Sequence, residues 1–113
     1  MLKPPRDITT MADLRVQIDR IDRDLVTLLA LRQAHIDRAA ELKPGEGVPA
    51  RIDARVRDVL DKVERQAQEV GFDPELARRM WTLMIEEMIA REERVLGCDR
   101  AVDRPVDRAV EEG

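Results

Sequence analysis

A regular stripe of apolar residues near the N-terminus constrains this chain more than any other feature. Within residues 13–43, leucine and isoleucine recur at alternating steps of four and three residues, at Leu14, Ile18, Ile21, Leu25 and Leu28. This spacing keeps one face of an α-helix apolar over about three heptads. The stretch therefore predicts one long amphipathic helix.

Arg32 interrupts that stripe. The same rhythm continues through Arg32, His35, Ala39 and Leu42, so an arginine stands where the pattern requires an apolar residue. Burying a guanidinium without an anion is costly, so this face either opens to water at Arg32 or meets an anion. Lys43 lies about 16 Å further along the helix and points nearly the same way. These cations favour a small anionic ligand.

Arg15 lies about 25 Å before Arg32 on the same helix and is rotated from it by about 100°. On one straight helix Arg15 cannot share a small site with Arg32, but it can serve a second copy of the chain. The composition agrees with an oligomer: 113 residues, 39% charged and 2% aromatic, suit helices with narrow apolar stripes and not a sheet. A small domain of this kind buries little apolar surface alone.

The charge pattern and the lack of long apolar segments exclude several classes. The net charge is −4 and no basic run suggests nucleic acid. No window approaches the roughly 18 apolar residues of a membrane span, and the N-terminus lacks the apolar region of a signal peptide. Cys98 is the single cysteine, which excludes an internal disulfide. We therefore expect a soluble, cytoplasmic protein. We expect no metal site at His35, because no second ligand is spaced to hold a metal with it.

Prolines, glycines and capping residues divide the chain. Thr10 and Asp13 form a capping pattern, Pro44 ends the first helix, Gly71 ends a second, and Asp73 opens a third. We expect one all-α domain over residues 10–97, built as a three-helix chain. Its parts are an extended lead-in over 1–9, helices over 13–43, 50–70 and 74–96, and a disordered, repetitive tail over 98–113.

Each of the two later helices is predicted to bury one face. The second should bury Ile52, Val56, Val59, Leu60 and Val63. The third should bury Leu76, Met80, Leu83, Met84 and Met88, with Trp81 and Ile85 beside them.

With these elements in place, the chain resembles the all-helical chorismate mutases, three-helix chains that form intertwined homodimers. The segment LRVQIDRIDRDLVTLLALRQ is similar to the family's opening helix, and MIEEMIAREE to the segment that carries its last polar contact. The resemblance covers about residues 10–97. It places family site positions at Arg15, Arg32, Lys43, Arg55 and Glu92.

The resemblance implies a cofactor-free reaction, the [3,3] rearrangement of chorismate to prephenate in aromatic amino-acid biosynthesis. Such an enzyme holds a dianionic substrate in a compact conformer and stabilises charge on its ether oxygen. Arg32 and Arg55 would bind carboxylates in one site, with Arg15 supplied across the dimer interface. Lys43 would donate to a carboxylate and to the ether oxygen.

Two positions depart from the usual mutase pattern. Many family members have glutamine where this chain has Glu92, and an ionised glutamate would repel the charge that develops on the ether oxygen. Glu92 must therefore carry a proton to assist, which predicts faster turnover at mildly acidic pH. Val56 replaces a glutamate that touches the ring hydroxyl, and Met88, one turn before Glu92, borders the ligand.

Val56 and the loop Val48-Pro49-Ala50 resemble the isochorismate-pyruvate lyases, relatives on the same scaffold whose last polar contact is usually glutamine. The mutase activity is favoured, with the lyase and an aminodeoxychorismate mutase as alternatives. A non-enzymatic helical module that binds a partner helix through the apolar stripe is the alternative from another class. Arg51 is the nearest rival to Arg55 as the arginine of the second helix that points inward.

Overall fold

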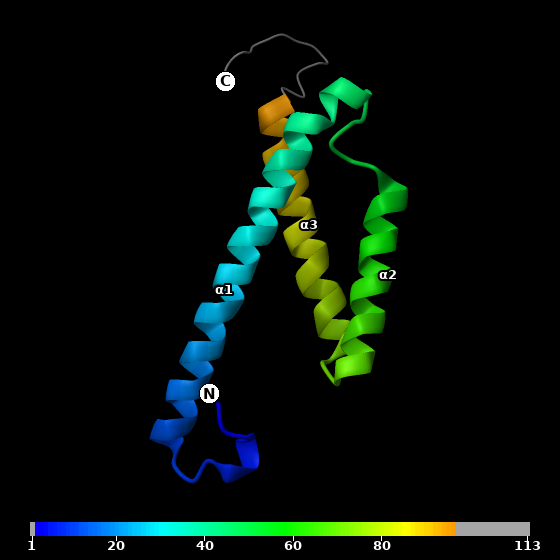
Figure 1. Ribbon diagram of the computed structural model, residues 1–113. Helices are drawn as coiled ribbons and strands as arrows, with labels where there is room; N and C mark the ends of the chain where they lie inside the picture. The colour runs from blue at the N-terminus through cyan, green and yellow to red at the C-terminus, as the bar shows by residue number, and fades with distance from the viewer. Residues whose placement is uncertain (1, 97–113) are drawn as a thin grey trace. The chain divides into compact units, whose positions relative to one another are not determined.

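All regular secondary structure in the described part of the chain is helical, as predicted. The structure, a computed structural model, describes residues 2–96, and these form three α-helices and two short 3-10 turns without a β-strand (Figure 1). Cys98 and the tail predicted over 98–113 lie outside the described residues. The elements are η1 Pro5–Asp7, α1 Met11–Leu42, η2 Pro44–Glu46, α2 Asp53–Val70 and α3 Pro74–Leu96.

The chain divides into two compact parts between His35 and Ile36, within α1. In the first part, the Thr10 hydroxyl accepts a hydrogen bond from the Asp13 N–H at 3.1 Å, which confirms the predicted cap. The lead-in is not extended throughout, because it contains η1. The backbone N–H of Lys3 donates to the side-chain oxygen of Gln17 at 2.7 Å, so the lead-in turns back onto α1.

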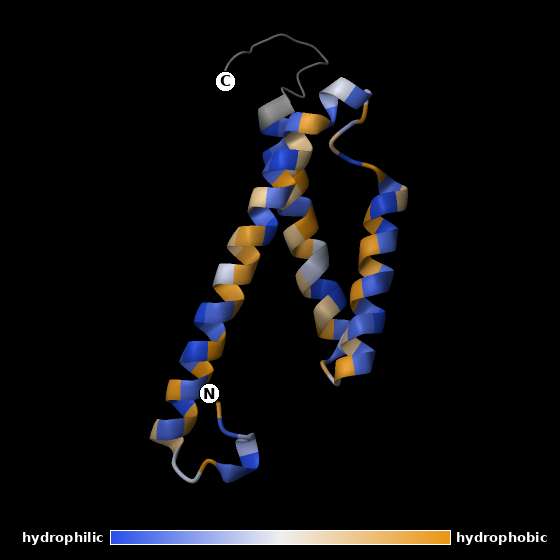
Figure 2. Cartoon of the chain, in the orientation of Figure 1, coloured by the Kyte–Doolittle hydropathy of each residue, from blue (hydrophilic) through white to orange (hydrophobic). Residues whose placement is uncertain are grey.

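The apolar stripe of α1 is exposed in the single chain. Figure 2 shows apolar residues recurring along the helix. Ile21, Leu25 and Leu28 are 42%, 51% and 62% exposed. Apolar side chains that recur on one face at this level of exposure are typical of an interaction surface.

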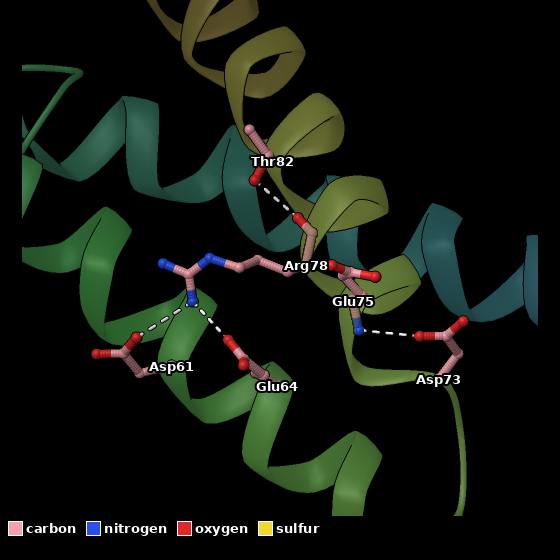
Figure 3. Close-up of polar contacts among 6 residues, drawn as sticks. All are labelled: Asp61, Glu64, Asp73, Glu75, Arg78 and Thr82. Atoms are coloured by element: carbon pink, nitrogen blue, oxygen red, sulfur yellow. Dashed lines mark hydrogen bonds and ion pairs between the residues drawn. The ribbon is translucent and has the colours of Figure 1, made fainter.

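In the second part, α2 and α3 pack against each other as a helical hairpin (Figure 1). Gly71 ends α2 in the left-handed conformation, with a φ of +82°, which glycine adopts without the strain that a side chain would cause. The carboxylate of Asp73 then accepts a hydrogen bond from the N–H of Glu75 at 3.0 Å (Figure 3). Local signals therefore set both ends of the turn, as predicted.

Arg78 adds a polar link between these two helices. Its guanidinium donates to Glu64 at 2.7 Å and to Asp61 at 3.3 Å, both on α2 (Figure 3). The hydrogen bond to Glu64, and then that to Asp61, raise the pKa of Arg78. All three side chains remain partly exposed, so this link orients the helices more than it stabilises them.

The apolar core of the hairpin consists of Leu60, Ile85 and Ile89. Val56, Val59, Trp81 and Ala50 pack against this cluster. On α2, Leu60 is therefore buried as predicted, with Val56, Val59 and Val63 half-buried. The prediction for Ile52 was wrong, because this residue is exposed and lies before the start of α2.

The predicted buried face of α3 was partly wrong. Leu76, Met80 and Leu83 are exposed. They lie on the side of α3 away from Ile85 and Ile89, which face the α2 contact. Periodicity alone did not distinguish the two sides, because both carry large apolar residues.

Candidate functional site

The second part of the chain brings Lys43 and Glu92 together. Lys43 directly follows α1, and Glu92 lies in the last turns of α3. The ammonium nitrogen of Lys43 donates to the Glu92 carboxylate at 2.6 Å. Glu92 is only 4% exposed, so this cation meets a carboxylate that is almost removed from water. A buried carboxylate is stable only when it is paired in this way.

The carbonyl oxygen of Ala50 is a second partner of Lys43, at 2.9 Å from its ammonium nitrogen. This contact accompanies an error in the predicted start of the second helix, which was placed at Ala50. Residues 48–52 are instead not helical, and α2 begins at Asp53 after an extended Ile52. The Ala50 carbonyl bonds to a distant ammonium rather than to a helical N–H. Because an ammonium has three donors, one N–H of Lys43 remains for a ligand.

A second ion pair joins the same two helix ends. The guanidinium of Arg91 on α3 binds both carboxylate oxygens of Asp37 on α1, at 2.7 and 3.0 Å. The hydrogen bond from Arg91 lowers the pKa of Asp37, which keeps that carboxyl ionised. Ala40 lies between Asp37 and Lys43 on α1 and is 2% exposed. The sequence analysis missed this pair.

Arg51 fastens the segment before α2 to α3. Its guanidinium donates to the carboxylate of Glu86 and lies 3.8 Å from Asp53. The hydrogen bond to Glu86 is the main cause of the raised pKa of Arg51. Arg51, the rival of Arg55, therefore holds the loop that carries the Ala50 carbonyl.

Arg55 does not join the Lys43–Glu92 pair within this chain. Its side chain is exposed and donates to Asp58, one turn further along α2, at 2.8 Å. Val56, the next residue, instead packs on the apolar cluster of the hairpin. Met88 is half-buried on α3, one turn before Glu92.

Arg15 and Arg32 belong to the first part of the chain. Arg15 is exposed near the start of α1. Arg32 is half-buried, and its Nη1 atom is shielded from solvent. An arginine at this position of the stripe is therefore partly withdrawn from water, and its role in binding an anion stays a prediction.

Within residues 2–96, the side chains offer a cation and a buried acid and not a metal centre. No group of three or more His, Cys, Asp or Glu residues there is arranged to hold a metal ion. None of the described helices is long and apolar enough to cross a membrane. The Lys43 ammonium can donate to an oxygen atom of a ligand and stabilise negative charge on it, whereas Glu92 as a carboxylate accepts hydrogen bonds.

Known proteins match most of this chain. The family model described as chorismate mutase type II matches residues 14–93, a range that contains every candidate site residue. An isochorismate pyruvate lyase of Pseudomonas aeruginosa is 35% identical over 92 residues, which are 80% of this chain and 89% of that protein. A chorismate mutase of Methanocaldococcus jannaschii is 26% identical over 89 residues, covering 79% and 90% of the two chains. The resemblance found in the sequence is thereby confirmed.

Replacing Lys43 tests the stability of the buried pair. Lys43→Met leaves the Glu92 carboxylate without its cation, and we expect a loss of about 3 kcal/mol in the free energy of unfolding. The double variant Lys43→Met/Glu92→Leu should recover most of that loss, because it removes the stranded charge as well. Lys62→Met, at an exposed lysine, is the control and should change little. Denaturant unfolding measures all three, and a Lys43→Met variant as stable as wild type would contradict the pairing.

Proposed function

We propose that this chain, which belongs to the chorismate mutase type II family, is a chorismate mutase that converts chorismate to prephenate without a cofactor. The observation that carries the proposal is the buried Glu92 hydrogen-bonded to Lys43. By resemblance, glutamate at this position occurs among the mutases, whereas the lyases usually have glutamine. The end of α3 therefore supports the mutase.

The proposed chemistry needs only positioning and hydrogen bonding. In the [3,3] rearrangement the ether C–O bond breaks while a C–C bond forms, and the product has the same atoms as the substrate. Negative charge grows on the ether oxygen as its bond lengthens. The Lys43 ammonium donates to that oxygen, and Glu92 donates as well when it carries a proton. These donors bind the transition state more strongly than the ground state, which is what accelerates the reaction.

The two carboxylates of chorismate require arginines. We assign them to Arg32 and Arg55 of one chain and Arg15 of a second copy, because a guanidinium binds a carboxylate through two parallel donors. Arg55 is held in the free chain only by its exposed pair with Asp58. Such pairs contribute little, so a substrate carboxylate can replace Asp58 as the partner of Arg55. Met88 and Val56 would border the bound ring.

The second copy is also proposed from the exposed face of α1. Three neighbouring positions of its apolar stripe, Ile21, Leu25 and Leu28, are exposed in one chain. A helix of a second copy with the same stripe would bury them in a self-complementary interface. The arrangement would also supply the Arg15 that one straight helix cannot bring to Arg32.

Isochorismate pyruvate lyase is the second candidate, favoured by Val56. The side chain of valine has no polar atom, so Val56 offers no acceptor to a ring hydroxyl. The relative of that name in Pseudomonas aeruginosa shares 35% identity. The lyase reaction also breaks an ether C–O bond, which Lys43 would assist in the same way.

Product identification separates the two candidates. The purified chain is given chorismate and isochorismate in parallel, and products are followed by absorbance, fluorescence and chromatography. We expect prephenate from chorismate at a higher kcat/KM than salicylate and pyruvate from isochorismate. The reverse ranking would replace the mutase by the lyase. Turnover of neither substrate would remove both and favour a non-enzymatic helical module.

Replacing the carboxylate of Glu92 by an amide tests its role in the chemistry. Glu92→Gln donates an N–H to the ether oxygen and carries no negative charge that would repel it, so we expect kcat to rise. Glu93→Gln, the same change at the adjacent position, is the control and should keep the wild-type kcat. If Glu92→Gln and wild type have the same kcat, Glu92 takes no part in the chemistry.

Mixing inactive variants tests whether the site is shared between chains. In a mixed dimer of Arg15→Ala and Arg55→Ala chains, one of the two sites contains both arginines. Random pairing of equal amounts should therefore restore about a quarter of wild-type activity. Arg32→Ala mixed with Arg55→Ala is the control and should restore none, since each site then lacks one arginine. Recovery only in the control mixture would reverse the assignment of Arg15 to the second chain.

A further inference from the structure

We propose that the Asp37–Arg91 ion pair is a positioning pair that places Lys43 against Glu92. It does so by fixing the register, the alignment of the end of α1 along the end of α3. The inference rests on the proposed function for its kinetic consequence, but its structural part stands without it. Neither Asp37 nor Arg91 is placed on the substrate. They act through Lys43 and Glu92.

The positions of the four residues carry the proposal. Asp37, Ala40 and Lys43 follow each other at steps of three along the end of α1, and Lys43 keeps helical dihedral angles, with φ −58° and ψ −43°. They therefore lie on one side of the helix, with the two charged residues about one turn before and after Ala40. On α3 their partners Arg91 and Glu92 are adjacent, so the two ion pairs bracket one short contact between the helix ends.

Of these contacts, the Asp37–Arg91 pair is the one that fixes the orientation of the end of α1 relative to the end of α3. Ala40 is buried but has a single methyl group, which resists sliding weakly. Lys43 reaches Glu92 on a flexible four-carbon stem that adapts to a shifted helix. The forked guanidinium of Arg91 instead holds both oxygens of Asp37, at 2.7 and 3.0 Å, and such a bidentate pair is specific in angle as well as distance.

The kinetic consequence follows from the geometry of the donors. The proposed reaction requires the Lys43 ammonium and the Glu92 carboxyl on the same ether oxygen, and a misplacement of about 1 Å can cost up to about a hundredfold in rate. Loosening the register should therefore lower kcat. KM should change less, because the carboxylates of the substrate are assigned to the arginines.

The chain offers a matched control in the same turns of α1. Arg38 and Glu41 form an ion pair at 2.8 Å within the helix, and both side chains are exposed. Glu41→Gln therefore removes one negative charge from the end of α1 without touching α3. Asp37→Asn removes the same charge from the pair that joins the two helices.

Lysine reactivity tests the register without any substrate. The chain has three lysines, Lys3, Lys43 and Lys62, so an amine-acylating reagent with mass spectrometry reads each one separately. In the full chain we expect Lys43 to react slowly relative to the exposed Lys62. Asp37→Asn should raise the Lys43-to-Lys62 ratio at least threefold, and Glu41→Gln should leave it unchanged. The charge-reversed double variant Asp37→Arg/Arg91→Asp should return the ratio toward the wild-type value.

Steady-state kinetics on the same variants completes the test. We expect kcat to fall about tenfold in Asp37→Asn, a moderate part of the loss possible for a misplaced catalytic group, with KM within about twofold. Glu41→Gln should match wild type, and the double reversal should recover kcat. If Asp37→Asn does not fold, Arg91→Lys, which keeps the charge but lacks the fork, takes its place in both measurements.

An unchanged Lys43-to-Lys62 ratio in the folded variant overturns the proposal. So does a raised ratio with kcat unchanged, since the register would then have no effect on catalysis. The proposed function fails by a different result, namely a wild-type chain that converts neither chorismate nor isochorismate. In that case the reactivity ratio alone decides whether the pair sets the register.

Discussion

The rest of the second part depends on one buried ion pair, Lys43 with Glu92. A carboxylate that is 4% exposed needs a cation, and its pairing with Lys43 brings the end of α1 against the end of α3. The same ammonium holds the Ala50 carbonyl, so the segment before α2 must also pass beside it. The end of α1, the segment before α2 and the end of α3 therefore meet at the ammonium nitrogen of Lys43. α2 begins only at Asp53, after the contact with Ala50.

The apolar core of the α2–α3 hairpin supports the Lys43–Glu92 pair through Ala50. Ala50 and Val56 both pack on the cluster of Leu60, Ile85 and Ile89, and Ala50 is at the same time the residue that binds Lys43. Polar contacts at Lys43 and apolar packing thus share one short segment. Water is largely excluded beside Glu92, and charge–charge and hydrogen-bond interactions are stronger in such surroundings than in solvent.

Local signals in the sequence were sufficient to predict the helices and their caps. Thr10, Gly71 and Asp73 act through atoms within a few residues of themselves, so the sequence contains the whole interaction. The late start of α2 was not predictable in this way, because the Ala50 carbonyl binds a lysine seven residues earlier that is placed by α3. The exposed side of α3 was missed for a similar reason, since only the packing of α2 selects one apolar face over another.

The residues of the candidate site also differ in how they could be predicted from the sequence. Arg32 was identified because it breaks a periodic stripe, and Lys43 because it follows in register, whereas Glu92 and Arg55 were identified by family resemblance alone. The structure pairs Lys43 with Glu92 and leaves Arg55 on the surface with Asp58. Arg55 can leave its exposed partner Asp58 at little cost and bind a ligand. Lys43 cannot leave the buried Glu92 without leaving a buried charge unpaired. Under the proposed function, the two cations therefore have different roles. Arg55 changes partner to bind a substrate carboxylate, whereas Lys43 donates to the ether oxygen while it stays paired with Glu92.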